Sequence, residues 1–106
     1  MLHKDLTAAA WFALSISEQF ANIGSEIERA MKWKNKNAQY AHQANLRALE
    51  LFDQTLQDPK YKAGLKEIAR ARELWLDYFI GGNQYSQTAD QWHKYIYAFT
   101  YAARNK

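Results

Sequence analysis

Residues 6–34 read LTAAAWFALSISEQFANIGSEIERAMKWK, the stretch with the longest helical periodicity in the chain. Steps of three and four residues trace an apolar stripe on one side of a helix, with no polar break: Leu6, Ala9, Ala13, Ile16, Phe20, Ile23, Ile27 and Ala30. A helix over residues 6–34 would be about 40 Å long, because each residue adds about 1.5 Å. Such a helix needs other helices against its apolar side. The stretch therefore predicts a helical bundle.

The length and composition of the chain are those of a small globular protein. A chain of 106 residues can bury a hydrophobic core without metals or disulfides, so we expect one domain over residues 1–106. The absence of cysteine removes thiol catalysis and cysteine-based zinc sites. A net charge of +3 is a mild bias, lower than a dedicated nucleic-acid binder normally carries. Residues 1–5 lead directly into an amphipathic helix, so we expect no signal peptide, no membrane partner and a cytoplasmic location.

Three more helices follow the first one, and each has recognisable ends. Asp58 can cap a helix whose first turn contains Pro59, which separates two of them. The Gly-Gly-Asn run at 81–83 tolerates positive φ and ends the next. Thr88 and Gln91 match a capping box and open the last. The sequence predicts an all-α fold, an up-and-down four-helix bundle with helices at 6–34, 38–57, 59–80 and 88–104.

The polar side of the first predicted helix carries small and amide residues where a solvated face usually has lysine and glutamate. It runs through Ser15, Glu18, Asn22, Ser25 and Arg29, and Trp11 extends the same line. Three interpretations stay open: a plain solvent face, a contact in an oligomer, and a line of residues that faces a ligand. Aromatic residues off the apolar stripes favour an interface. The candidate interface residues are Trp11, Asn22, Ser25, Trp33 and Tyr101.

Lysines alternate with a tryptophan where the first predicted helix ends, at Lys32, Trp33, Lys34 and Lys36. Such a pattern can hold a phosphate backbone while the indole stacks on a base. Lysines also gather at helix C-termini, because cations interact favourably with that end of the helix dipole. The segment is therefore either a nucleotide or RNA contact or a solvated helix end.

Arg72 falls in the middle of the apolar residues of the helix predicted at 59–80. A guanidinium there must be paired or solvated, because an isolated buried charge is costly. Asp53 is the preferred partner, since it also lies near an inward face, and Glu18 is the second choice. Arg72 is thus either half of a structural ion pair or an anion-binding arginine in a cleft.

His93 and Tyr97 belong to a second polar line on the last predicted helix. Asp90 and His93 have the carboxylate-x-x-His spacing of one half of a di-iron site, but such a site needs a second pair and further carboxylates, and the sequence has no second pair. There is no glycine-rich phosphate loop, nucleophile elbow or HExxH motif. We therefore predict no metal, no cofactor and no catalytic residue, and the sequence favours a protein without enzymatic activity.

Residues 14–30, LSISEQFANIGSEIERA, resemble the opening helix of a small group of one-domain helical proteins from bacteria and archaea. The pair Tyr78-Phe79 before Gly-Gly-Asn and the stretch 95–104 resemble the same group. This resemblance implies the helical fold and brings no activity with it. More distantly, the four-helix plan and residues 48–51, ALEL, are similar to the nucleotidyltransferase-substrate-binding and HEPN group, which includes RNases and inert relatives. In that group the RNases depend on an arginine separated by four to six residues from a histidine, and no histidine here has an arginine at that distance upstream.

Two hypotheses of function follow from these features. The leading one is a non-enzymatic interaction or helper protein that acts as a homo-oligomer, with a dimer expected, through the off-core aromatics and the small-residue line of the first helix. The alternative is a nucleotide- or RNA-related helical subunit that holds phosphate with Arg72, Arg29, His93 and the lysines at 32–36. The candidate ligand-binding residues are Arg72, Asp53, Glu18, Arg29, His93 and Tyr97.

Overall fold

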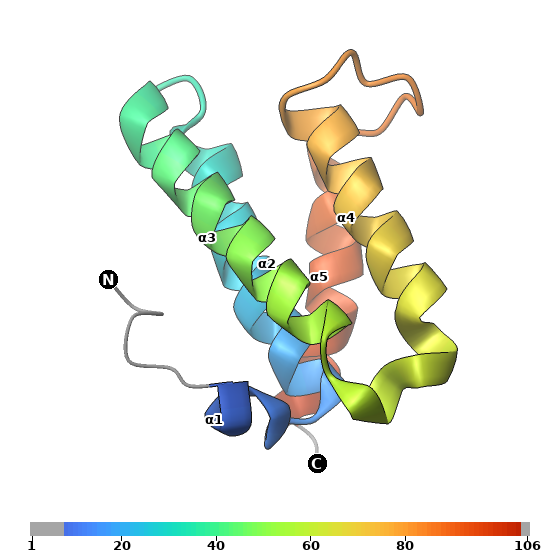
Figure 1. Ribbon diagram of the computed structural model, residues 1–106. Coiled ribbons are helices and arrows are strands. Elements are labelled where there is room, and N and C mark those ends of the chain that lie inside the picture. The colour runs from blue at the N-terminus through green and yellow to red at the C-terminus, as the bar shows by residue number, and fades with distance from the viewer. Residues whose placement is uncertain (1–7, 105–106) are drawn as a thin grey trace.

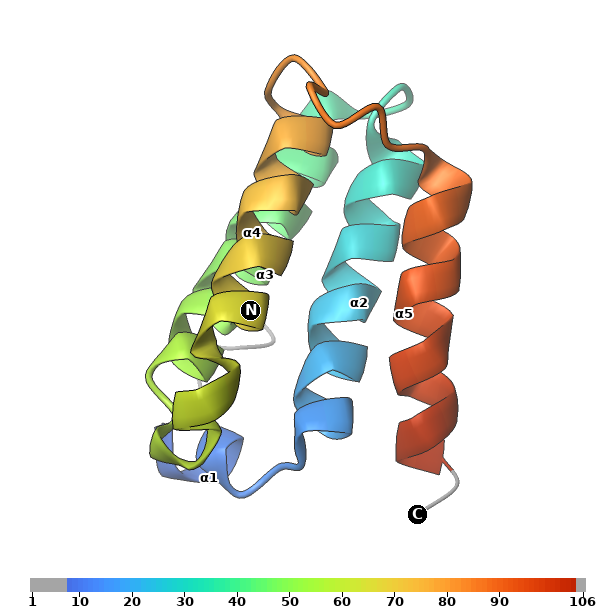
Figure 2. The ribbon, with the colours of Figure 1, turned by 90° about the vertical axis from the view of Figure 1, so that its right-hand side faces the viewer.

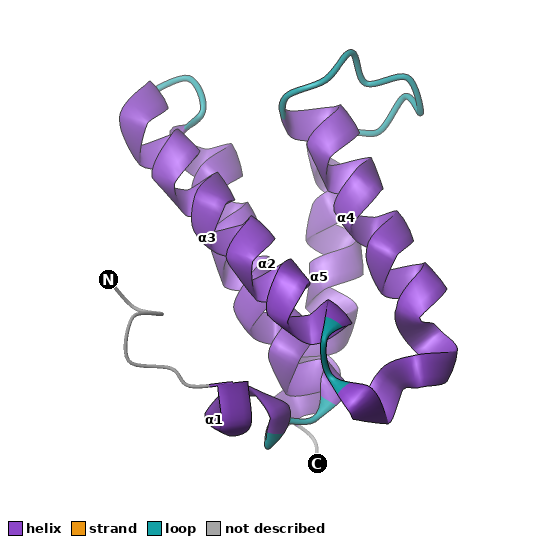
Figure 3. Ribbon diagram, viewed as in Figure 1, coloured by secondary structure: helices purple, strands orange, loops and turns teal. Residues whose placement is uncertain are grey.

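Residues 8–104 are described by a computed structural model, apart from the side chains of residues 61–63, 103 and 104 (Figure 1). This part of the chain consists of helices and loops without a strand, which confirms the all-α prediction (Figure 3). It contains five α-helices and one 3₁₀ helix: α1 Ala8–Phe12, α2 Ile16–Trp33, α3 Ala38–Leu56, η1 Pro59–Gly64, α4 Leu65–Phe79 and α5 Ala89–Arg104. Among these described helices, none has the length and apolar character that crossing a membrane requires.

The predicted helix over residues 6–34 is wrong, because the structure divides it at residues 13–15 into α1 and α2. Ser15 is the N-cap of α2. Its Oγ accepts a hydrogen bond from the Glu18 backbone N–H at 3.1 Å, and the Glu18 carboxylate accepts one from the Ser15 N–H at 2.8 Å. This reciprocal pair is a capping box, which starts a new helix. Residues 6 and 7 of the prediction lie outside the described residues.

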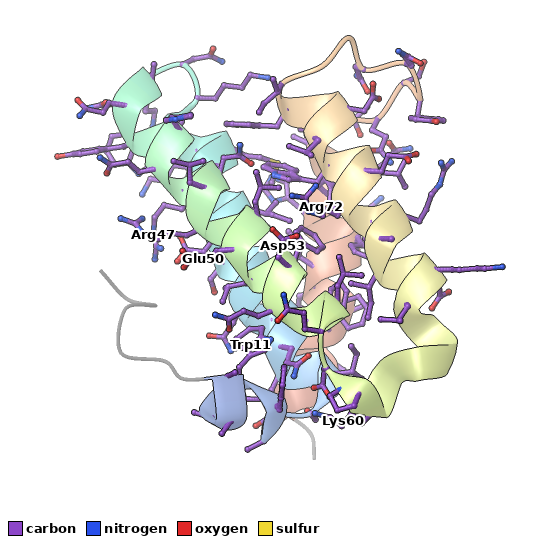
Figure 4. The ribbon with its side chains drawn as sticks, in the orientation of Figure 1. Trp11, Arg47, Glu50, Asp53, Lys60 and Arg72 are labelled. Atoms are coloured by element: carbon purple, nitrogen blue, oxygen red, sulfur yellow. The ribbon has the colours of Figure 1, made fainter. Side chains whose placement is uncertain are left out.

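Helix α1 lies across one end of the longer helices and is fixed there by a buried indole (Figures 1 and 4). Trp11 is 1% exposed, and its Nε1–H donates to Thr55 Oγ1 of α3 at 3.0 Å. The Thr55 hydroxyl donates in turn to the Leu51 carbonyl at 2.9 Å. Gln19 of α2 donates from Nε2 to the Trp11 carbonyl at 2.9 Å. The prediction of Trp11 as an interface residue is therefore wrong, because its side chain belongs to the core.

Helix α2 is central in the molecule. It packs along α3 and along α5, and α3 packs on α4 (Figure 2). The core among these helices includes Ile23, Ile27 and Leu51, all fully buried. Helices α4 and α5 meet through aromatic rings, with Trp75 of α4 edge-on to Trp92 of α5 at a centroid distance of 5.5 Å. Large side chains, and not close backbones, therefore fill the space between α4 and α5.

The helix predicted at 59–80 is shorter and begins with a different geometry. Its first six residues form η1, and α4 follows. Asp58 caps η1 because its Oδ1 accepts the Lys60 N–H at 3.0 Å, with Pro59 in the first turn as predicted. The buried Asp58 Oδ2 also accepts from Lys60 Nζ at 2.6 Å and from Gln19 Nε2 at 3.0 Å. Burial acts to raise the pKa of Asp58, but these hydrogen bonds outweigh it, and the pKa is lowered.

The loop between α4 and α5 turns at its asparagine and not at its glycines. Asn83 and Ser86 have φ values of 51° and 52°, whereas neither Gly81 nor Gly82 has a positive φ. The Asn83 side chain stabilises the turn, since it donates to the Gln87 carbonyl at 2.9 Å and accepts the Gln87 N–H at 2.9 Å. Within the Gly-Gly-Asn run, therefore, only Asn83 has a positive φ.

Helix α5 begins as predicted. The Thr88 N–H donates to Gln91 Oε1 at 2.9 Å, and the Gln91 N–H donates to Thr88 Oγ1 at 3.2 Å, which confirms the capping box. The next residue, Trp92, is buried and donates from Nε1 to Gln87 Oε1 at 3.0 Å. The start of α5 is thus tied both to its own cap and to the preceding loop.

Candidate functional site

Arg72 and Asp53 form the ion pair that the sequence predicts (Figure 4). Arg72 Nε of α4 donates to Asp53 Oδ1 of α3 at 2.9 Å, and Arg72 Nη2 donates to Oδ2 at 3.5 Å. The side chains are 31% and 50% exposed, so the pair lies at the surface and not in the apolar interior. Glu18, the second predicted partner, is wrong, because its carboxylate caps α2. Arg72 therefore connects α3 and α4 with its charge matched by a carboxylate.

Arg29 and His93, two further basic residues of the nucleotide hypothesis, have carboxylate partners of their own. Arg29 Nη1 bonds to the buried Glu26 at 2.8 Å within α2. His93 Nδ1 of α5 lies 2.6 Å from Glu28 Oε1 of α2. Together with the Arg72 pair, these contacts place the three basic residues on three separate carboxylates. In the described part of the chain they do not converge on one cleft.

The lysine-rich end of α2 contacts aromatic rings of the same chain. Lys32 Nζ is 5.5 Å from the centroid of the Trp33 ring. Trp33, a predicted interface residue, is half-buried and packs edge-on against Tyr40 of α3 at 5.5 Å. Lys34 Nζ lies 5.3 Å from the Phe79 ring at the end of α4. Cation–π contacts of this kind hold two of the lysines against the protein surface.

One face of the molecule gathers several predicted residues from α2 and α5. Asn22 and Ser25 are exposed on α2, and His93, Tyr97 and Tyr101 are exposed on α5. A groove of about 530 Å³ lies between the two helices, with walls that include Gly24, Ser25, Glu28, His93, Tyr97 and Thr100. Tyr97 and Tyr101 are 64% and 57% exposed, and their ring centroids are 6.1 Å apart. We call the groove and the five exposed residues the α2–α5 face.

Gly24 lets α2 and α5 approach each other closely beneath this face. A Cβ added to Gly24 would overlap Cγ2 of Ile96 and lie 3.2 Å from its Cγ1. Glycine is therefore the residue that fits at this crossing. On the same helix, the side chains of Asn22 and Ser25 donate to carbonyls one turn earlier, at 2.8 and 3.2 Å. Because Gly24 has no side chain and Ser25 has a short one, α2 projects little from this face. The polar donors of Asn22 and Ser25 have their partners within α2.

A second, larger groove lies between α4 and α5, and we call it the α4–α5 groove. Its volume is about 760 Å³, and its walls include Lys66, Arg70, Ala71, Trp92, Tyr95 and Phe99. The sequence does not predict this groove. Helical spacing shows that Lys66 and Arg70 share one face and that Tyr95 and Phe99 share another, but it does not show that the two faces oppose each other.

Charged groups line the α4 side of the α4–α5 groove. Arg70 lies 4.7 Å from the ring centroid of Tyr85 and bonds to Glu73 at 2.9 Å. The hydrogen bond with the Tyr85 hydroxyl raises the pKa of Arg70. Burial, followed by the negative charge of Glu67, raises the pKa of Tyr95 on the opposite wall. At neutral pH the groove therefore holds a permanent cation and a neutral phenol.

The two grooves present aromatic rings, hydroxyl groups and charged side chains. No group of three histidine, cysteine, aspartate or glutamate side chains in the described residues could hold a metal ion. Of the sequence-predicted residues, Arg72 and Asp53 form one pair, and Asn22, Ser25, His93, Tyr97 and Tyr101 lie on the α2–α5 face. Trp11, Glu18, Arg29 and Trp33 lie outside both, and the α4–α5 groove is formed by residues that the sequence does not predict as a site. Comparisons of the chain with protein-family models, with curated proteins and with solved structures find no match.

Proposed function

We propose that the chain is a non-enzymatic interaction protein that forms a homo-oligomer, in the simplest case a dimer, through the α2–α5 face. The observation that carries this proposal is the exposed pair Tyr97 and Tyr101 beside a groove. Tyrosine is enriched at interfaces because its ring buries a large apolar area while its hydroxyl keeps a polar partner. Two such rings side by side on α5 form a ridge that a partner surface can cover.

The α2–α5 face has the two parts that a two-fold interface needs. In an isologous dimer both subunits use the same patch, so a projection and a recess must occur on one surface. Tyr97 and Tyr101 supply the projection, and the groove above Gly24 supplies the recess. The ridge of one subunit can therefore enter the groove of the other.

Two hydroxyl groups on the groove walls can be buried at such an interface without losing their hydrogen bonds. The Ser25 hydroxyl donates to a carbonyl of its own helix at 3.2 Å, and the Thr100 hydroxyl donates to the Ile96 carbonyl at 3.2 Å. A buried polar donor is costly when it loses its partner, and these two keep theirs. Covering the groove therefore leaves neither hydroxyl unpaired.

The same proposal includes the finer architecture. We assign α2, α3, α4 and α5 to an up-and-down four-helix bundle and α1 to a clasp across one end. The packing of α2 on α3 and α5, and of α3 on α4, supports this assignment (Figure 2). We also propose that the chain is cytoplasmic and that it is distantly related to the inert members of the HEPN group.

Light scattering at several protein concentrations tests self-association. The wild-type chain should reach twice the monomer mass of 12.4 kDa, and the double variant Tyr97→Ala/Tyr101→Ala should stay at the monomer mass. Tyr40→Ala is the matched control, because it removes an exposed tyrosine on α3. A monomeric wild type, or a dimer that survives the double substitution, would contradict the proposal. A gain of mass only with short RNA at low salt would favour the nucleotide alternative instead.

A further inference from the structure

We propose that the α4–α5 groove binds a small aromatic anion, that is, a molecule with a flat ring system and one carboxylate, sulfonate or phosphate group. This inference is independent of the proposed self-association, because the α4–α5 groove and the α2–α5 face use different residues. It concerns a surface that was not predicted from the sequence.

The dimensions of the α4–α5 groove suit a small molecule. Its volume of about 760 Å³ lies in the range of about 300–1,000 Å³ that is typical of ligand pockets. A separate, smaller hollow of about 120 Å³ has Glu67, Tyr95 and Phe99 in common with the groove, and its walls also include Ile16 and Phe20 of α2. One or two fused rings fit this space with room for a polar substituent.

The α5 wall of the groove is a row of aromatic rings. Tyr95 stands edge-on to Trp92 at 5.7 Å and edge-on to Phe99 at 5.2 Å. Successive perpendicular rings offer both faces and edges to an incoming ring, and both are favourable geometries for aromatic contact. On the opposite wall, Ala71 is buried and has a small side chain, which leaves the space between the helices open.

The α4 wall determines which charge the ligand should carry. Lys66 and Arg70 are four residues apart, so both lie on the same side of α4 at the groove. Arg70 shares its charge with Glu73, whereas no carboxylate of the described residues lies within ion-pair distance of Lys66. Glu67 is the opposing charge, and it lines the groove together with Tyr95 and Phe99. Among the charged residues that line the groove itself there are two cations and one carboxylate, which favours an anionic group at the Lys66 and Arg70 side.

Three probes with one ring system separate charge from shape. They are 1-naphthaleneacetate, 1-naphthaleneacetamide and 2-(1-naphthyl)ethylamine, which carry a negative, zero and positive charge. In NMR titrations of the intact chain, the acetate should bind about tenfold more tightly than the amide, and the amine should bind most weakly. The shifted amide signals should be those of α4 and α5. Equal affinity for the three probes, tightest binding of the amine, or no binding of the acetate would each overturn the proposal.

Substitutions on α4 connect the selectivity to particular side chains. Lys66→Gln with Arg70→Gln should lower the acetate affinity about tenfold, to that of the amide, without changing amide binding. Glu67→Gln should strengthen acetate binding. Lys36→Gln is the charge control, because it removes an exposed lysine outside the groove. If the double substitution weakens acetate and amide equally, the cations do not recognise the anion and the proposal fails.

Filling the groove gives a test that does not depend on charge. Ala71→Leu places a larger side chain in the groove wall and should abolish binding of both acetate and amide. Ala69→Leu is the matched control, because this alanine is exposed on the same helix and should leave binding unchanged. Circular dichroism verifies that both variants fold. Two outcomes would overturn the assignment. One is unchanged acetate binding in a folded Ala71→Leu chain. The other is a loss of dimer mass in this variant, which would show that a second copy of the chain occupies the groove.

Discussion

Gly24→Ala tests the close packing of α2 against α5. In a helix without tertiary contacts this change stabilises by about 1 kcal/mol, because glycine is a poor helix former. Here the new Cβ would overlap Cγ2 of Ile96 and lie 3.2 and 3.3 Å from its Cγ1 and Cβ. Ile96 is 6% exposed and β-branched, so it has little freedom to rotate away. Overpacking costs about 1–3 kcal/mol, and an overlap with such a stiff side chain puts the cost near 3. The net loss should be about 2 kcal/mol.

Urea unfolding followed by circular dichroism measures this loss directly. In a separate thermal unfolding experiment, the loss of about 2 kcal/mol should lower the midpoint temperature by about 8–16 °C, because 1 kcal/mol corresponds to about 4–8 °C in a domain of this size. Gly64→Ala is the matched control. Nothing lies within 4 Å of a Cβ added there, and the φ of −100° suits alanine, so its free energy of unfolding should stay the same or rise by about 0.5 kcal/mol.

A double-mutant cycle separates the steric term from the helix propensity. Ile96→Ala removes the γ-carbons that the new methyl would meet. In that background Gly24→Ala should stabilise by about 1 kcal/mol, so that the sign of its effect reverses. If Gly24→Ala stabilises the wild-type chain as much as it stabilises the Ile96→Ala chain, the two residues are not coupled, and the described packing of α2 on α5 is refuted.

Three further predictions concern stability, each measured as the free energy of unfolding in urea. Asp58→Ala should cost about 2 kcal/mol at neutral pH through the lost cap. Because the pKa of Asp58 is lowered from 3.8, its charge stabilises the fold above that pH and ceases to do so as the pH falls below it, so the difference from wild type should narrow in acid. Arg72→Ala should cost no more than about 1 kcal/mol, because Arg72 and Asp53 are both partly solvated, and a loss above about 2 kcal/mol would contradict that placement. Trp11→Phe removes an indole hydrogen bond in the core and should cost about 1–2 kcal/mol, and an unchanged midpoint would count against that bond.

Capping signals in the sequence are reliable here because they act between neighbouring residues. The pair Thr88 and Gln91 predicts the start of α5, and the structure confirms it. Ser15 and Glu18 have the same spacing and the same reciprocal bonds, yet the uninterrupted apolar stripe favours one long helix across them. Where the capping box and the apolar stripe predict different helix boundaries, the capping box determines the boundary. Its side chains accept hydrogen bonds from backbone N–H groups that have no partner at the start of a helix.

The Arg72–Asp53 partnership is predictable, but its depth is not. If Leu65, Phe79 and the apolar residues near them face inward, Arg72 lies in the middle of the apolar side of the helix predicted at 59–80. The buried residues of α4 are Ile68, Ala71 and Trp75, which centre the buried face to one side of Arg72 and leave its guanidinium at the edge. A small alanine contributes little to an apolar pattern in the sequence, although in the structure it marks where a neighbour comes close.

The α4–α5 groove depends on a quantity that no local pattern contains, namely the distance between two helices. The edge-on contact of Trp75 and Trp92 at 5.5 Å keeps the backbones of α4 and α5 apart. Smaller residues at these positions would let the helices close. The sequence shows that both positions carry large aromatic residues, but it does not show the space beside them.

Trp11 shows why the break at residues 13–15 changes more than one boundary. A helical wheel relates two residues only while the same helix connects them, since each residue adds about 100°. On a continuous helix Trp11 shares a line with the polar residues of α2 and faces outward. Because α1 ends at Phe12, its direction is independent of α2, and it turns across the end of α3, where the indole reaches Thr55. The capping box at Ser15 therefore converts an apparent surface aromatic into a core residue.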